Sequence, residues 1–163
     1  MSGDPIVPVV IDTNVLVPSL YSYTPIAQFI LAGNLVLIWN KYIYDEVNMI
    51  INKLANRYRN KAGVEPEEVI TLLDLVTYAG IRVPEMPDDW PPVSTDRKDD
   101  PFLWAAMVGN ADYIISDDRL HMLKLKSFKG ITIGRPGSFF KWVINMHPMT
   151  SKYSRRGQIG SCT

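Results

Sequence analysis

The stretch at residues 9–17, VVIDTNVLV, constrains the fold most, because it is an apolar run interrupted once by an acid, Asp12. Pro8 precedes its first half, and Asp12-Thr13-Asn14, which we interpret as a turn, follows it, which predicts a short buried strand. Asp12 would then stand at the carboxyl end of that strand, the edge where open α/β sheets bind ligands. A carboxylate there needs a metal ion, a cation or hydrogen-bond donors, or it caps a following helix or turn instead.

Short apolar runs alternate with segments of helical periodicity along the rest of the chain. This alternation predicts an α/β protein, a three-layer α/β/α sandwich whose central parallel sheet has helices on both faces and right-handed crossovers. Further strands are expected at 35–39, 81–83, 111–115 and 131–133. Helices are expected at 26–32, 41–62, 66–79, 102–108, 120–125 and 138–143.

The chain has 163 residues and 47% hydrophobic content, which is enough for one domain with its own core. Residues 1–146 are expected to form that domain, and 147–163, with little to bury, a flexible basic tail. We find no apolar run of membrane-spanning length and no secretory signal. Cys162, the one cysteine, fits a reducing compartment, so the cytoplasm is the expected location and no membrane partner is expected.

Acidic residues are predicted at three more places beside the same sheet edge. The fourth expected strand ends at Ser116-Asp117-Asp118, which repeats the layout of an apolar strand followed by an acid. Asp100 precedes Pro101, which predicts that Asp100 is the N-cap of the next helix. Glu46 lies one turn into the helix after the second strand. Carboxylates gathered at one edge repel one another, and a hard divalent cation, Mg²⁺ or Mn²⁺, usually relieves that repulsion.

Each acid also has a structural interpretation that the sequence leaves open. Asp100 and Asp118 can serve only as helix caps, and Glu46 can be a solvated helix residue. Asp99 and Asp117 are neighbours that a metal site can recruit, and we expect surface or supporting roles for both. The metal hypothesis therefore depends on the convergence of several acids, and clustered acids with such ions commonly serve phosphodiester chemistry.

Other site chemistries find no support in the sequence. His121 and His147 lack the spacing of metal ligands, and we expect both at the surface. We find no nucleophile elbow, P-loop or dinucleotide-binding glycine motif. A phosphatase of the Asp-x-Asp type needs an acid where Asn14 stands, and the late strand-end lysine of a receiver domain is missing.

Four blocks of the chain resemble the PIN domain, and more narrowly its VapC-like branch, the ribonuclease toxins of toxin–antitoxin systems. The likeness extends over roughly residues 7–144, and the order and spacing of the blocks make it specific. The blocks are Val10–Leu16, Tyr44–Val47, Asp99–Leu103 and Ala111–Asp118.

The resemblance implies a Mg²⁺- or Mn²⁺-dependent nuclease that hydrolyses phosphodiester bonds in RNA, with an antitoxin as protein partner. Asn14 and Ser116 match polar family positions that hold water or ligands. Asp117 stands where glycine is common, which leaves open whether Asp117 or Asp118 is the primary ligand. The catalytic and metal-binding acids carried over by position are Asp12, Glu46, Asp100 and Asp118.

RNA binding would need a local basic patch, because 17 Lys and Arg residues balance 17 Asp and Glu residues. The alternative function is a catalytically silent PIN-like module that binds nucleic acid or protein. A homodimer is compatible with apolar exposure on the helical face around Leu54 and Leu72. The candidate RNA contacts are Arg57, Arg97 and Lys98, with Arg59 and Lys61 beside them.

Overall fold

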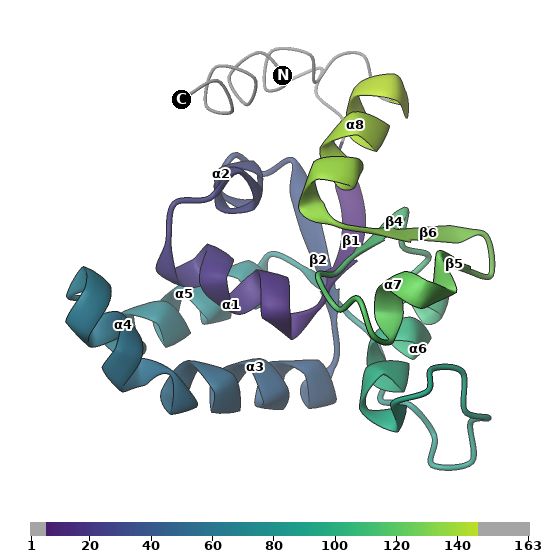
Figure 1. Cartoon of the computed structure of the whole chain (residues 1–163), viewed down its shortest axis with the longest axis horizontal. Helices are drawn as coiled ribbons and strands as arrows, with labels where there is room; N and C mark the ends of the chain where they lie inside the picture. Colours follow the sequence, from purple (N-terminus) through teal and green to yellow (C-terminus); the bar gives the residue numbers. More distant parts are fainter. Residues whose placement is uncertain (1–5, 147–163) are drawn as a thin grey trace.

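A six-stranded sheet runs through the centre of the computed structural model, which describes residues 6–146 (Figure 1). In chain order the strands are β1 (Val7–Ile11), β2 (Leu35–Trp39), β3 (Ile81–Arg82), β4 (Tyr113–Ile115), β5 (Ser127–Phe128) and β6 (Ile131–Gly134). Across the sheet the order is β3-β2-β1-β4-β6-β5. Neighbouring strands are parallel except β5 and β6, which are antiparallel.

Helices flank this sheet and confirm the predicted α/β class. In the packing, α1 contacts α3 and α5, and α2 meets α8 through an edge-to-face contact between Phe29 and Phe139. The helices are α1 (Thr13–Tyr21), α2 (Pro25–Leu31), α3 (Lys41–Lys53), α4 (Ala55–Ala62), α5 (Pro66–Tyr78), α6 (Asp100–Val108), α7 (Met122–Leu125) and α8 (Pro136–Met146), with a 3₁₀ turn, η1, at Arg97–Asp99.

The first strand is apolar throughout because helices cover both faces of the sheet. Val9, Val10 and Ile11 are all buried in the core. A strand that is buried on both faces reads as a continuous hydrophobic run rather than as an alternating one. The strand predicted from the apolar half of residues 9–17 is therefore confirmed.

The sheet order creates a switch point between β1 and β4. From β1 the chain continues to β2 and β3 on one side, and it then crosses to β4 on the other side. The carboxyl ends of β1 and β4 adjoin, and the backbone N–H of Asp12 donates to the carbonyl of Ile115 at 2.8 Å. Because open α/β sheets bind ligands at such points, the topology concentrates the strand-end acids where a site is expected.

Two helical segments differ from the prediction. The chain enters α1 directly after Asp12, where the sequence indicated a turn; this helix is apolar on most sides and contains Pro18, so it lacks an amphipathic pattern. The helix predicted at 41–62 is broken at Leu54, whose ψ of 4° ends α3. Up to Leu54, α3 buries an apolar face against the core. The polar helix α4 has no buried side chain among those described, so the chain turns away at Leu54 because nothing in α4 requires the same packing.

The periphery contains smaller differences. The two-residue strand β5 escaped prediction, because two residues give no periodicity, and α8 is longer than the predicted 138–143. Leu54 and Leu72, expected on an exposed face, are partly buried against the core, whereas Tyr78 of α5 is 91% exposed. The predicted tail, 147–163, lies outside the described residues together with His147.

The described helices also bear on the question of a membrane. None of the helices within residues 6–146 combines the length and the apolar character that a membrane span requires.

Candidate metal centre

Asp12 caps α1 and reaches the sheet edge at the same time. Its backbone is extended (φ −64°, ψ 148°), and Oδ1 accepts a hydrogen bond from the N–H of Thr13 at 2.8 Å. The other oxygen, Oδ2, accepts from the hydroxyl of Ser116 at 2.7 Å. Asp12 is only 7% exposed. The sequence left open whether Asp12 is a cap or a member of an acidic cluster, and the structure shows that it is both.

Ser116 connects Asp12 to Asp118. Its buried hydroxyl donates to Asp12 and accepts from the backbone N–H of Asp118 at 3.0 Å. The Asp118 carboxylate in turn accepts from the N–H groups of Leu120 and His121 at 3.1 and 3.2 Å. These bonds fix both strand-end carboxylates relative to the sheet.

Asp117 points to a different set of partners. Its Oδ1 accepts from Nε of Arg135 at 3.0 Å, and its backbone N–H donates to Oδ1 of Asn14 at 3.2 Å. Asn14 thereby ties the start of α1 to the segment after β4. The structure thus places Asp118, rather than Asp117, beside Asp12.

Asp100 is fully buried and is held from several sides. Its Oδ2 forms an ion pair with Nη1 of Arg97 at 2.8 Å, and its Oδ1 accepts from the N–H of Ser94 at 2.8 Å. Asp100 has helical geometry (φ −60°, ψ −35°) and is the first residue of α6. The prediction that Asp100 is the N-cap is therefore wrong, because η1 advances the helix by one residue and Asp99 precedes it.

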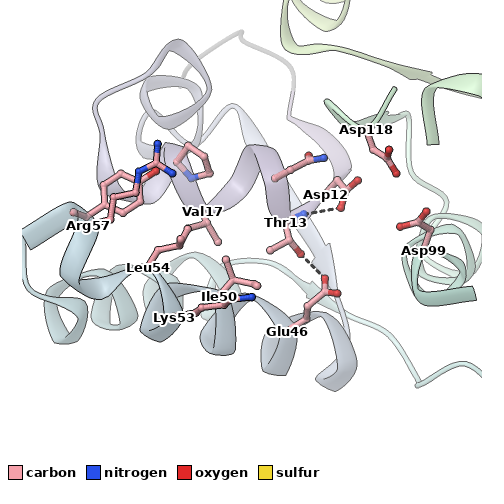
Figure 2. Close-up of a pocket in the computed structure, with 13 residues that line it drawn as sticks. Asp12, Thr13, Val17, Glu46, Ile50, Lys53, Leu54, Arg57, Asp99 and Asp118 are labelled. Carbon is pink, nitrogen blue, oxygen red and sulfur yellow. Dashed lines mark hydrogen bonds between the residues drawn. The ribbon is translucent and has the colours of Figure 1, made fainter. Parts of the chain in front are cut away.

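Asp99 takes the place that we expected for Asp100. One carboxylate oxygen from each of Asp12, Asp99 and Asp118 lies within 4.8 Å of the other two. Figure 2 shows the three side chains converging from β1, the start of α6 and the segment after β4. The structure does not bring Asp100 to this cluster. Asp99, predicted only in a supporting role, is thus one of the three central acids.

Burial raises the proton affinity of two of these acids. Burial raises the pKa of Asp12 to about 6, and the charges of Asp99 and Glu46 add to this rise, whereas the hydrogen bond from Ser116 opposes it. The pKa of Asp99 is also raised to about 6; burial is the largest cause, and the charge of Asp118 is the second. Holding these carboxylates ionised together is therefore unfavourable unless a cation offsets their charge.

Glu46 approaches the cluster from α3, one turn after the end of β2. Its Oε2 accepts a short hydrogen bond, 2.5 Å, from the hydroxyl of Thr13. Glu46 lines the same groove as the three aspartates, as predicted, and Thr13 orients it (Figure 2). Sequence reasoning missed Thr13, which we interpreted as part of a turn, since its partner lies 33 positions away.

The three aspartates fit a hard divalent cation. An ion such as Mg²⁺ or Ca²⁺ binds carboxylate oxygens at about 2.0–2.6 Å, so two of its ligand oxygens lie at most about 4–5 Å apart. The separation of 4.8 Å or less among Asp12, Asp99 and Asp118 meets this limit with little adjustment. A set of oxygen ligands is also what Mg²⁺ and Mn²⁺ prefer. Asp12, Asp99 and Asp118 could therefore hold one such ion.

Of the predicted RNA contacts, Arg57 lines the groove, and Lys53, which was not among them, lines it as well. Arg97 is bound to buried Asp100, and Lys98 is exposed outside the groove. Arg97 therefore has a structural partner rather than a free charge.

Without metal, the groove acids are expected to stabilise the folded protein less as the pH rises. The pKa of Asp12 and of Asp99 is about 6 in the folded protein against an ordinary 3.8, so the native state binds these protons more tightly. The stability that the folded state gains by holding these protons is fully present below about pH 4, and it is lost as the pH rises through about 6. In EDTA, the double variant Asp12→Asn/Asp99→Asn should melt above the wild type at roughly pH 7.5, and by a smaller margin at roughly pH 5.

Thermal unfolding followed by circular dichroism at the two pH values checks this expectation. Added Mg²⁺ or Mn²⁺ should raise the melting temperature of the wild type at the higher pH, because an ion that binds only the native state stabilises it. The double variant should show little response. An equal difference in melting temperature between the two proteins at both pH values would contradict the proposal that the ionised carboxylates of Asp12 and Asp99 destabilise the fold.

Comparison with known families identifies the PIN domain. The PIN domain family model matches residues 8–120, a range that contains Asp12, Glu46, Asp99 and Asp118. No curated protein matches the chain.

Proposed function

The chain belongs to the PIN domain family, and from this membership and its acidic groove we propose that it is a metal-dependent endoribonuclease. The observation that carries the proposal is the convergence of Asp12, Asp99 and Asp118, with oxygens within 4.8 Å of one another, at the switch point of the sheet. Their groove is open to solvent, so a phosphodiester can reach them. Hydrolysis of phosphodiester bonds is the chemistry that such a site supports best.

The division of work among the side chains follows from the contacts. Asp12, Asp99 and Asp118 would hold Mg²⁺ or Mn²⁺, which when bound offsets the negative charge that develops on the phosphate and makes water easier to deprotonate. Glu46 uses Oε2 to accept from Thr13. Its Oε1 has no hydrogen-bond partner among the described residues, so this oxygen can accept a proton from the attacking water and orient it.

RNA is the proposed substrate because the four sequence blocks resemble those of VapC-like ribonucleases. The same likeness supports the proposal that the enzyme is the toxin of a toxin–antitoxin pair, with an antitoxin as the protein that restrains it. A second candidate, a catalytically silent binding module, has no specific observation in its favour.

The purified protein is expected to cut single-stranded RNA at internal positions when Mg²⁺ or Mn²⁺ is present. EDTA should stop the cleavage and an excess of either ion should restore it, because the aspartates alone supply no positive charge to the phosphate. End-labelled RNA and a DNA strand of the same sequence, separated on denaturing gels, test both the activity and the choice of RNA. RNA binding without any cleavage under these conditions would favour the silent module.

A further inference from the structure

The groove continues well beyond the acids. It has a volume of about 600 Å³, and Lys53 and Arg57 line it as well as the acids. Figure 2 shows Arg57 at the opposite end from Asp99 and Asp118, with Lys53 between Arg57 and Glu46. The groove is thus divided into an acidic end and a basic end. Val17, Ile50 and Leu54 lie between the two ends (Figure 2), and Pro18 also lines the groove.

Lys53 shares a helix face with Glu46, because residues 46, 50 and 53 recur at helical spacing along α3. Arg57 belongs to α4, beyond the break at Leu54, and lines the same groove. At a rise of about 1.5 Å per residue, Lys53 lies about 10 Å along the helix axis from Glu46. Arg57 lies farther along the groove than Lys53 (Figure 2), so the two cations together would contact phosphates other than the one that lies at the acids.

The two cations are free to bind an anion. Neither Lys53 nor Arg57 has a hydrogen bond or an ion pair with any residue in 6–146, and both are exposed. Four other cations of the described residues are held in ion pairs. The pairs are Lys41 with Asp45, Arg59 with Glu65, Arg97 with Asp100 and Arg135 with Asp117.

An aromatic ring completes the basic end. Tyr58 lines the groove and stacks on Tyr21, with ring centroids 3.9 Å apart and planes inclined by 7°. Tyr21 is itself buried, and its hydroxyl donates to the carbonyl of Ile51 at 3.0 Å. The stack therefore holds Tyr58 in place. A fixed ring beside unpaired cations and an apolar floor is the combination that single strands use, since bases stack on aromatic rings while cations follow the backbone.

We propose that Lys53, Arg57 and Tyr58 form a strand-binding subsite that holds single-stranded RNA at a distance from the cleaved bond. This inference rests on the proposed ribonuclease function and adds a requirement for a strand that fills the whole groove. The free cations contact phosphates of the flanking nucleotides, and the apolar floor with Tyr58 receives their bases. A duplex keeps its bases within its own stack and cannot use this floor, so the subsite selects unpaired RNA.

Binding measurements test the subsite apart from catalysis. Fluorescence anisotropy with a labelled RNA of about 12 nucleotides is measured in Mg²⁺ on the Asp12→Asn background, which keeps the strand intact. Lys53→Ala/Arg57→Ala should weaken binding of the single strand by about tenfold or more. It should also make the dependence of the binding constant on salt less steep: the magnitude of the slope of log K (the association constant) against the logarithm of the salt concentration should fall by about 0.7 for each cation removed. Lys141→Ala, which removes an exposed charge on α8, is the control and should change binding less than about twofold.

Kinetics on two substrates provide the second readout in the otherwise wild-type enzyme. The ratio of kcat/KM for the RNA strand to kcat/KM for bis(4-nitrophenyl) phosphate, a diester too small to reach Lys53, should fall about tenfold or more in the double variant. Tyr58→Leu should lower the preference for single strand over duplex. An unchanged salt slope, or a double variant that binds like the Lys141 control, would overturn the subsite. Failure of the wild type to hydrolyse either substrate would overturn the ribonuclease proposal, and the binding arm would still decide on the subsite.

Discussion

Asp12→Asn is expected to abolish RNA cleavage while the protein stays folded. Asp12 is the most buried of the three central acids, and it is tied to Asp118 through the hydroxyl of Ser116. Loss of its charge removes a ligand from the metal centre, and several kcal/mol of transition-state stabilisation depend on the bound cation. The rate of cleavage should therefore fall by at least about 100-fold.

The same substitution is expected to stabilise the protein in the absence of metal. Burial raises the pKa of Asp12 to about 6, so its charged form is disfavoured at neutral pH. Asparagine keeps one oxygen that can accept from the N–H of Thr13, and its NH₂ group can donate to the hydroxyl of Ser116. Removal of the buried charge should stabilise the fold by on the order of 1–2 kcal/mol and raise the melting temperature in EDTA by a few degrees.

Cleavage assays and melting curves on the same preparations check both parts. A wild-type sample in EDTA serves as the control for stability, and Lys141→Ala serves as a substitution away from the groove. If Asp12→Asn cleaved RNA as fast as the wild type, Asp12 would not be a metal ligand that cleavage requires. A large drop in melting temperature would mean that its carboxylate is mainly structural.

The strand-end acids could be predicted because their position follows from simple topology. An apolar run that ends in an acid predicts a carboxylate at the sheet edge, and two such runs in a parallel sheet place two carboxylates together. Asp12 and Asp118 meet this expectation. Glu46 also does, since a residue one turn into the helix after β2 faces back over the edge.

The third acid was misplaced because the helix start was wrong by one residue. Asp-Pro at a helix start predicts an N-cap at the aspartate, but η1 begins at Arg97 and brings Asp100 into the helix. A shift of one residue turns a side chain by about 100° around a helix axis. The Asp100 side chain is therefore buried against Arg97, and Asp99 points to the groove.

The position of Lys53 in the groove could have been predicted from its spacing to Glu46. Lys53 follows Glu46 by seven positions, which is two helical turns, so the two side chains belong to one face. The apolar positions of α3 define its buried side and leave Lys53 on the outer face, so these positions alone do not single it out. The groove between α1 and α3 reaches part of that outer face, and this feature depends on packing between helices.

Asp99→Asn and Asp100→Asn are expected to separate metal binding from structure, although the two residues are adjacent. Asp99→Asn should lose cleavage by at least about 100-fold, because it removes a ligand oxygen from the cluster. Its melting temperature in EDTA should match or exceed that of the wild type, since burial and the charge of Asp118 raise the pKa of Asp99.

Asp100→Asn should instead destabilise the fold. The amide would leave Arg97 without its ion-pair partner, and its NH₂ group would face donors where the carboxylate now accepts from Val93, Ser94 and Arg97. Breaking one side of a buried pair typically costs about 3–5 kcal/mol; part of this loss is relieved here because Arg97 is partly exposed, so a fall on the order of 10 °C is expected.

Melting curves and cleavage rates at a temperature where both variants are folded decide between the two aspartates. At that temperature Asp100→Asn should retain most of its cleavage, and Mn²⁺ should raise its melting temperature as it does for the wild type. Asp99→Asn should show neither response. The reverse pattern would return Asp100 to the metal centre, because a folded Asp100→Asn protein that neither cleaves nor responds to Mn²⁺ has lost a ligand rather than an internal ion pair.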